Sequence, residues 1–279
     1  MNPAMSEPAL PKIRIDRITQ TYIKKNAPFV VLDNFSIDIA ENEFVTVAGT
    51  SGCGKSTLLN IVGGLTEPTS GQVLIDGRPI DGPGRDRGFV FQSYSLFEWL
   101  NVTANILFAL KKTSLSSTEK RDLVRHYIEA VGLRGFENAY PAELSGGMRQ
   151  RVAIARALIH RPAVLLMDEP FGALASQTRG MMQELLLKVW SEHKTTVLFI
   201  THDVDEAIFL SDRVVVMSSR PGALKQDTAI HIPRPRGYEV MTDSLFISAK
   251  KGLIEAIREE TLETMAVASH DSSNSRVSL

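Results

Sequence analysis

The chain has 279 residues, of which 43% are hydrophobic and 23% are charged, and its 31 basic and 32 acidic side chains leave a net charge of −1. This balance is that of an ordinary globular protein, long enough for one large domain with an appendage. Because there is no basic excess, general binding to nucleic acid is disfavoured. Cys53 is the only cysteine, which excludes an internal disulfide and favours the cytosol.

The start of the chain, MNPAMSEPALPKIRID, has no positive segment followed by an apolar one, so it does not resemble a secretion signal. We expect residues 1–11 to be flexible. The longest apolar runs, such as TTVLFI and RVVVM, are strand-sized, and none approaches the roughly 20 residues that cross a bilayer. If this protein works at a membrane, another chain must span it.

The first third of the chain predicts strands. The segments KIRIDRI and FSIDIAENEFVTVAG alternate apolar with polar residues, as strands with one buried face do. Val73 and Ile75 lead into Asp76-Gly77, a pair typical of hairpin turns.

The middle of the chain predicts helices. In SSTEKRDLVRHYIEAVGL the apolar residues have amphipathic spacing, Ser116 and Glu119 have capping-box spacing, and Gly132 is a stop signal. NVTANILFALKK also predicts a helix, and GMRQRVAIARALIH predicts one that is stopped by Pro162.

After Pro162, the apolar strands AVLLM, TTVLFI and RVVVM alternate with the predicted helices RGMMQELLLKVWSEH and VDEAIFLSD. Continuous apolar strands separated by helices indicate a parallel sheet covered on both faces, and hence an α/β fold. We expect residues 241–266 to form a helical extension and the polar residues 267–279 to be disordered.

The segment GTSGCGKST fits the pattern G-x-x-x-x-G-K-[ST] and lies between an apolar strand and an apolar helix, the context that this motif requires. Its glycines allow backbone N–H groups to point at phosphate oxygens. We predict that Lys55 reaches the β- and γ-phosphates and that Ser56 binds Mg²⁺. The alternative is a glycine-rich turn with a solvated lysine. The predicted nucleotide-binding residues of this segment are Gly49, Thr50, Ser51, Gly52, Cys53, Gly54, Lys55, Ser56 and Thr57.

Cys53 allows two interpretations. It is a redox sensor if the helix N-terminus lowers the pKa of its thiol. It is otherwise a small residue whose backbone N–H faces phosphate, and we favour this second interpretation.

Two adjacent acids, Asp168 and Glu169, follow the apolar run VLLM, where an unpaired charge is costly. Beside a phosphate loop, a metal ion supplies the missing counter-charge. We predict that Asp168 faces Mg²⁺ and that Glu169 polarises the attacking water. The alternative is a pair of solvated acids in a turn before Pro170.

Gln92 and His202 also follow apolar strands, and ligands bind at the carboxyl ends of parallel strands. We predict that Gln92 contacts Mg²⁺ or the attacking water, and that His202 contacts the γ-phosphate. A lone Gln or His is more often structural, but the position of these two favours function.

The segment LSGGMRQR contains a Ser-Gly-Gly turn that opens a helix, which makes a second anion site. One nucleotide does not need two such sites from one subunit. A head-to-tail dimer would use both, with the turn of each chain closing on the ATP held by the other. The residues predicted to act in this way are Leu144, Ser145, Gly146, Gly147 and Gln150.

The order of GTSGCGKST, Gln92, LSGGMRQR, VLLMDEP and His202 resembles the ATP-binding subunit of ABC transporters over about residues 12–240. The resemblance implies a P-loop NTPase with a RecA-like α/β core, an antiparallel β subdomain and an α-helical signature subdomain at about 93–160. It also implies an ATP sandwich dimer, most simply a homodimer, that hydrolyses ATP with Mg²⁺. Tyr22 lies where the family places an aromatic that stacks on adenine; the alternative is a strand-surface tyrosine.

Further segments, including VFQSYSLFEWLNV, PFGALASQTR and THDVDEAIFLSDRVVVMSSRPG, are similar to importers of nitrate, sulfonates and taurine. This resemblance implies a peripheral protein at the cytoplasmic face of the inner membrane, with permease subunits as partners and a solute-binding protein as an indirect one. Coupling to the permease would pass through residues 97–100. The rivals are a soluble ABC-type ATPase acting on nucleic acid or ribosomes, and a P-loop kinase or GTPase, which would lack LSGGMRQR.

In the resembled family, GALA normally carries Asp at its fourth position, where this chain has Ala175. That aspartate usually lies at the dimer seam and helps to couple the two sites. We therefore predict weakened coupling with hydrolysis retained. The alternative is that Ser176 or Gln177 compensates.

Overall fold

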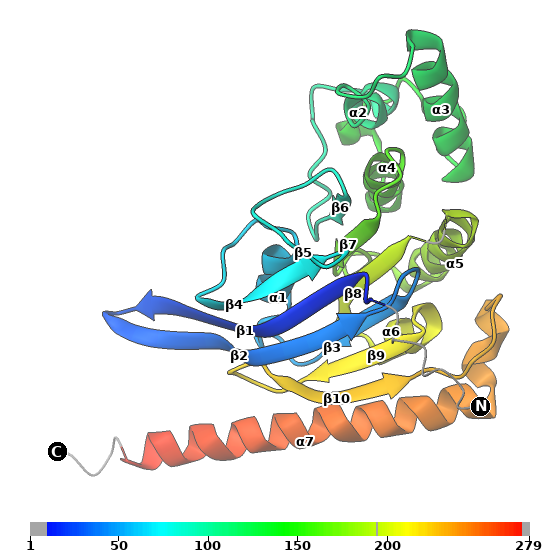
Figure 1. Ribbon diagram of the computed structural model, residues 1–279. Coiled ribbons are helices and arrows are strands. Elements are labelled where there is room, and N and C mark those ends of the chain that lie inside the picture. The colour runs from blue at the N-terminus through cyan, green and yellow to red at the C-terminus, as the bar shows by residue number, and fades with distance from the viewer. Residues whose placement is uncertain (1–9, 194, 275–279) are drawn as a thin grey trace, which may run out of the picture.

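A computed structural model describes residues 10–193 and 195–274, which form two sheets with helices around them (Figure 1). Residues 1–9 and 275–279 lie outside the described part, so the flexibility predicted for the N-terminus stays a prediction. In the described part, no helix combines the length and the apolar character needed to cross a membrane.

The smaller sheet is antiparallel, with strand order β2-β1-β4-β5. Its strands are β1 (Ile13–Lys24), β2 (Ala27–Ile39), β4 (Ser70–Ile75) and β5 (Arg78–Pro79). Alternate residues of β1 and β2 fill one buried face, as the apolar pattern predicted. Asp76 and Gly77 have φ values of 50° and 72° and form the predicted hairpin turn.

The larger sheet has strand order β10-β9-β3-β8-β7-β6, and its neighbours are parallel except for the β10–β9 pair. Its strands are β3 (Phe44–Ala48), β6 (Arg87–Val90), β7 (Val164–Asp168), β8 (Thr196–Thr201), β9 (Arg213–Met217) and β10 (Leu224–Ala229). Strand β10 was not predicted, because LKQDTA is mostly polar and lies at the sheet's edge.

The register of the parallel strands aligns their carboxyl ends. Ala48 pairs with Thr201 and with Val216, and Asp168 pairs with Ile200. The loops that follow β3, β7, β8 and β9 therefore leave the sheet along one edge.

Helix α1 (Lys55–Val62) leads from β3 of the larger sheet to β4 of the smaller one. Helices α5 (Ser176–His193) and α6 (Val204–Leu210) connect β7 to β8 and β8 to β9 within the larger sheet. Helices α2 (Val102–Phe108), α3 (Ser117–Ala130) and α4 (Gly146–Leu158) form a separate group at the top of Figure 1. The hydroxyl of Tyr127 in α3 donates to the carbonyl of Leu158 in α4 at 3.2 Å and helps to join this group.

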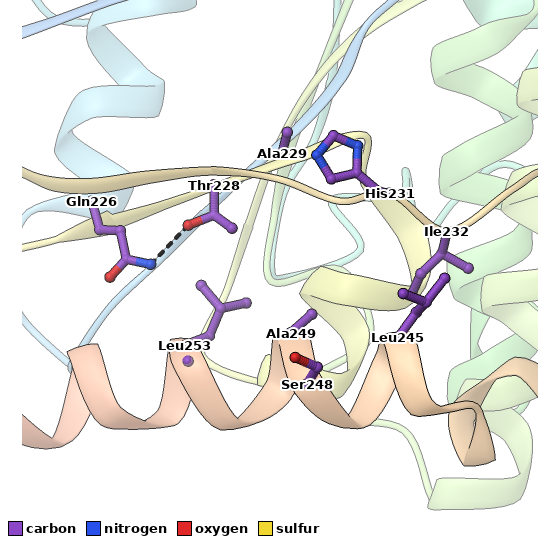
Figure 2. A pocket seen from close by; sticks show the side chains of 10 residues that line it. Gln226, Thr228, Ala229, His231, Ile232, Leu245, Ser248, Ala249 and Leu253 are labelled. Atoms are coloured by element: carbon purple, nitrogen blue, oxygen red, sulfur yellow. Dashed lines mark hydrogen bonds between the residues drawn. The ribbon is translucent and has the colours of Figure 1, made fainter.

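Helix α7 (Ser244–Asn274) runs beneath β10 (Figure 1), and Leu245, Ala249 and Leu253 face that strand across a pocket (Figure 2). The predicted disorder is wrong for residues 267–274, which are helical. The physical reason is that neither glycine nor proline follows Gly252, so nothing stops the helix.

Helix α3 begins with the predicted capping box. The Ser116 hydroxyl accepts from Glu119 N at 3.3 Å, and the Glu119 carboxylate accepts from Ser116 N at 2.8 Å. We expect Ser116→Ala to lower the free energy of unfolding by about 1 kcal/mol, because it leaves a backbone donor without its cap. Urea unfolding followed by circular dichroism measures this, with the exposed neighbour Ser117→Ala as the control. Equal stability of the two variants would contradict the capping role.

Candidate nucleotide site

The phosphate loop lies between β3 and α1. Gly52 and Gly54 have φ values of 80° and 110°, a backbone region that side chains rarely adopt. A Cβ atom at Gly54 would lie 2.8 Å from Cδ2 of Leu32, so the loop also has no room for a side chain there. The curl and the N-terminus of α1 together present backbone N–H groups to one pocket.

Lys55 lies inside this curl. Its side chain is 5% exposed, and Nζ donates to the carbonyl oxygens of Gly49 at 2.9 Å and Thr50 at 3.0 Å. In the described part of the chain no carboxylate forms an ion pair with this ammonium group. Its remaining partner is Sγ of Cys53 at 3.9 Å. A buried cation whose partners are all uncharged is a suitable counter-charge for an incoming phosphate.

Asp168 ends β7 and meets the phosphate loop directly. Its Oδ1 accepts from the Ser56 hydroxyl at 3.1 Å. Burial raises the pKa of the Asp168 carboxyl, and the hydrogen bond from Ser56 opposes this shift only in part. The ionised carboxylate therefore has too little positive charge near it to offset the cost of its burial.

The Ser56–Asp168 pair fits Mg²⁺, which prefers hydroxyl and carboxylate oxygens and takes its remaining ligands from phosphates and water. Within the described residues there is no group of three or more His, Cys, Asp or Glu side chains that would hold a metal alone. A hard cation at this pair would therefore depend on the nucleotide for the rest of its coordination.

Glu169 and His202 form the second polar pair of the site. Oε2 of Glu169 lies 3.1 Å from Nδ1 of His202. Glu169 has a φ of 41°, unusual for a residue with a side chain, and its N–H donates to Ile200 O at 2.9 Å. This turn directs the carboxylate away from the strand and toward the end of β8.

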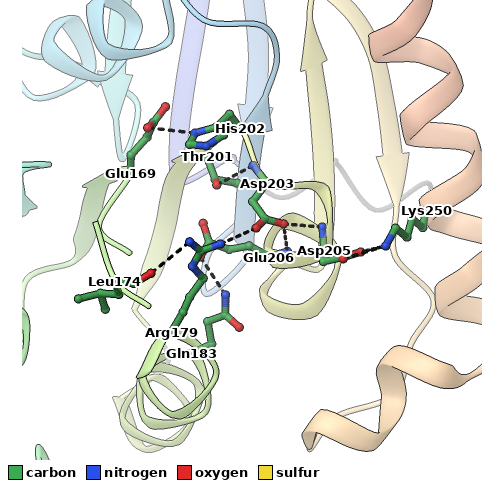
Figure 3. A network of polar contacts seen from close by, with 10 residues as sticks. All are labelled: Glu169, Leu174, Arg179, Gln183, Thr201, His202, Asp203, Asp205, Glu206 and Lys250. Carbon is green, nitrogen blue, oxygen red and sulfur yellow. Dashed lines mark hydrogen bonds and ion pairs between the residues drawn. The ribbon is translucent and has the colours of Figure 1, made fainter. Parts of the chain in front are cut away.

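A network of polar contacts continues from this pair (Figure 3). Asp203 caps α6 by accepting from the N–H groups of Asp205 and Glu206, and its other oxygen accepts from Arg179 at 2.8 Å. Arg179 also donates to Leu174 O at 3.3 Å. The loop that precedes Ala175 is therefore tied to the strand end that carries His202.

One pocket gathers eight of the fourteen residues predicted to act on the nucleotide, the metal and the attacking water within one chain. The residues that line it are Val31, Ser51, Gly52, Gly54, Lys55, Ser56, Thr57, Gln92, Glu169 and Arg220. Gln92 is exposed, so its side chain is open to a ligand. Asp168 borders the pocket through Ser56, and His202 through Glu169.

The predicted signature residues do not line this pocket. Ser145 is exposed, and its hydroxyl caps α4 by accepting from Met148 N at 3.3 Å. Leu144 and Gln150 are buried within this chain. Whether the signature residues act on the ATP held by a second chain stays a prediction. Gln150 lies on the inward face of α4, one turn from the buried Gly147, and among the described residues its amide oxygen and nitrogen have no hydrogen-bond partner.

Tyr22 is 42% exposed and lies outside the pocket lining. It pairs directly with Phe29 of β2, and Val31 is two residues further along that strand. Tyr22 and Phe29 lie directly opposite each other and share one face of the sheet, and Val31, at a register shift of the same strand, lines the pocket. An apolar strip therefore leads from the phosphate loop to Tyr22.

Cys53 is buried, and burial raises the pKa of its thiol. A raised pKa disfavours the reactive thiolate. Of the two interpretations of Cys53, the small residue whose backbone does the work fits better.

The sequence interpretation missed two residues that line the pocket, Val31 and Arg220, and only Arg220 is charged. It follows β9 just as Gln92 follows β6 and His202 follows β8. The same rule, a polar residue shortly after an apolar strand, would have found it.

A family model described as ABC transporter matches residues 32–172. The nitrate import ATP-binding protein NrtD of Synechocystis sp. is 45% identical over 264 residues, which cover 92% of this chain and 99% of that protein. The aliphatic sulfonates import ATP-binding protein SsuB of Bacillus cereus is 48% identical over 224 residues, covering 80% and 88%. A solved ATP-binding cassette, dimeric in a post-hydrolysis state with ADP and Pi, is 34% identical with a TM-score of 0.70 and covers 79% of this chain and 100% of its own.

The raised pKa of Asp168 predicts that the carboxylate proposed to bind Mg²⁺ lowers the stability of the nucleotide-free protein. We expect Asp168→Asn to raise the melting temperature of the nucleotide-free protein at pH 7.5, because the neutral amide removes a buried charge that lacks a counter-ion. The gain should shrink as the pH falls through the raised pKa toward the unfolded value, since the native carboxyl then binds a proton. Differential scanning calorimetry at several pH values from 7.5 down to about 4, near the pKa of an unfolded Asp, measures this. A gain that stays constant across that range would contradict the assignment.

Proposed function

This chain belongs to the ABC transporter family, and we propose that it is the ATP-hydrolysing subunit of an importer for nitrate, a sulfonate, taurine or a similar small solute. The observation that carries the proposal is the convergence of Lys55, the Ser56–Asp168 pair and the Glu169–His202 pair at one sheet edge. The names of the two import proteins described above support the class of solute.

The proposed hydrolysis uses groups that the fold already holds in place. The N–H groups of the phosphate loop and the ammonium group of Lys55 stabilise negative charge on the phosphates. When bound, Mg²⁺ adds positive charge there, held by Ser56 and Asp168 with Gln92 close by. The Glu169 carboxylate orients a water and takes a proton from it as the water oxygen bonds to the γ-phosphorus. The bond from that phosphorus to the oxygen shared with the β-phosphate breaks, and ADP leaves with the electron pair. His202 holds Glu169 in place through Nδ1. The free Nε2 of His202 is left to bind the γ-phosphate.

A second copy of the chain completes the proposed site. The Ser145 turn is exposed and does not reach the pocket of its own chain, so it is available to another. A dimeric cassette of the same fold supports this arrangement. Within the signature segment Ser145 is exposed, and Gly146, Met148, Arg149 and Arg151 are half-buried.

An aromatic patch is the proposed contact with the permease. Trp99 is 74% exposed, and its ring lies 5.5 Å from that of Phe97, which in turn lies 4.4 Å from the ring of Phe108. The patch follows Gln92 in the chain, so movement at the nucleotide has a short path to it. Exposed aromatic groups of this kind are typical of protein interfaces. The protein would then lie at the cytoplasmic face of the membrane.

The soluble alternative, an ABC-type ATPase acting on nucleic acid or ribosomes, has less support. The import proteins named above match most of this chain, and the net charge of −1 offers no general attraction to nucleic acid. Co-purification with a polytopic membrane protein tests transport against this rival.

We expect Glu169→Gln to lower the ATPase rate by roughly 10²–10⁴-fold, because the amide does not accept the proton of the water. The trapped MgATP should hold two chains together, which light scattering after gel filtration measures as a dimer. Glu184→Gln, at an exposed acid of α5, is the control. A Glu169→Gln variant that stays monomeric in saturating MgATP would contradict the sandwich.

Ala175 is the N-cap position of α5, since its carbonyl accepts from Arg179 N at 2.9 Å. Alanine is a poor N-cap, so Ala175→Asp should stabilise the helix start by about 1 kcal/mol.

We also expect the variant to raise the Hill coefficient of ATP hydrolysis, if the missing acid weakens coupling between the two sites. Steady-state rates over a range of ATP concentrations measure this, and identical Hill coefficients and rates in both proteins would retire the coupling idea.

A further inference from the structure

The turn between β9 and β10, residues 218–223, is fixed against the phosphate loop. Gly222 N donates to Val31 O at 2.9 Å, and Asp33 N donates to Gly222 O at 3.0 Å, so the turn is joined to β2. A Cβ atom at Gly222 would lie 2.2 Å from the carbonyl oxygen of Cys53. The turn therefore has little freedom to move relative to the pocket.

Arg220, at the tip of this turn, forms part of the pocket wall. Its Nε donates to the carbonyl oxygen of Gly52 at 3.0 Å, and its Nη2 donates to the same atom. The guanidinium carbon lies 4.7 Å from the centre of the Phe29 ring. The group thus bridges the phosphate loop and the apolar strip that leads to Tyr22.

The guanidinium group retains capacity for an anion. In the described part of the chain, no carboxylate pairs with Arg220, and its Nη1 has no protein acceptor. The side chain is exposed, and it lines the pocket together with Lys55 and Ser56. A planar cation with free N–H groups on a pocket wall is suited to phosphate oxygens.

We propose that Arg220 binds the phosphate of the nucleotide that is nearest to the base, and that Glu260 of α7 positions it. The site of contact follows from the two neighbours of Arg220, since Gly52 belongs to the phosphate loop and Phe29 to the strip on the base side. The inference rests on the proposed nucleotide function of this pocket.

Glu260 holds the residue next to Arg220. It is 5% exposed, and its carboxylate accepts from Ser219 N at 2.6 Å and from the Ser219 hydroxyl at 2.8 Å. The same carboxylate forms an ion pair with Lys225 at 2.7 Å. Because Ser219 precedes Arg220 directly, α7 determines where the guanidinium group lies. The C-terminal helix thereby acts on nucleotide affinity from outside the pocket.

The test measures binding of ATP and of ADP by calorimetry in the full-length protein. The variants are Arg220→Ala and Arg220→Lys at the contact, Glu260→Gln at its support, and Lys55→Ala as the reference. Glu255→Gln changes an exposed acid of the same helix and is the matched control for Glu260. Melting temperatures without nucleotide show that each variant is folded.

We expect Arg220→Ala to weaken ATP and ADP binding by the same factor, about tenfold, because the phosphate nearest the base is common to both. The KM for ATP should rise while kcat stays within about twofold, since binding without a contact special to the transition state acts on KM. Arg220→Lys should recover part of the affinity. Glu260→Gln should weaken both ligands by about threefold, and Glu255→Gln should match the wild type.

Affinities of Arg220→Ala within twofold of the wild type would overturn the contact, as would a fall in kcat with KM unchanged. Equal affinities of Glu260→Gln and Glu255→Gln would overturn the positioning role. If the wild type and Lys55→Ala bound neither nucleotide, the proposed function itself would fail. If Lys55→Ala alone lost affinity, the function would stand and the inference would fail.

Discussion

The hydrogen bond between Ser56 and Asp168 is the contact on which the rest of the site depends. It joins the first turn of α1 to the end of β7, two strands away from β3 in the sheet. It forms because parallel pairing through β8 aligns the ends of β3 and β7. A shift of one residue in either pairing would turn Asp168 to the opposite face of the sheet. The register of the buried apolar strands therefore determines where the charged groups of the site lie.

The loops that leave the same edge of the sheet carry the other polar side chains of the site. Gln92 follows β6, His202 follows β8, and Arg220 follows β9. Strands β8 and β9 are almost wholly buried and β6 is half-buried, so each polar group follows a strand that is held in the sheet. Arg179 connects the loop before Ala175 to the segment after His202, because it donates to both Leu174 O and the Asp203 carboxylate. At Asp168 the requirements of stability and of function conflict, because burial disfavours the ionised carboxylate that a magnesium site requires.

The sequence predicted the elements whose signals are local and strong. Apolar strands such as TTVLFI, the Ser116–Glu119 cap and the glycine loop all appear where the pattern placed them. Three features escaped for physical reasons. Strand β10 pairs through its backbone and has few apolar side chains, α7 continues because nothing stops it, and Arg220 acquires its neighbours only through tertiary contacts. The burial of Gln150, in contrast, could have been predicted from the spacing of the apolar residues in its helix. We assigned its polar group to the second anion site because it belongs to the motif.

The central claim is that the glycine loop and its lysine hold the phosphates of a magnesium-bound nucleotide. Titration calorimetry of ATP, with and without Mg²⁺, into the wild type and into Lys55→Ala tests it most directly. The account predicts saturable binding by the wild type and a loss of at least about tenfold in the variant, because a charge-assisted contact to phosphate is removed. Absent binding in the wild type, or equal affinity in both proteins, would contradict it.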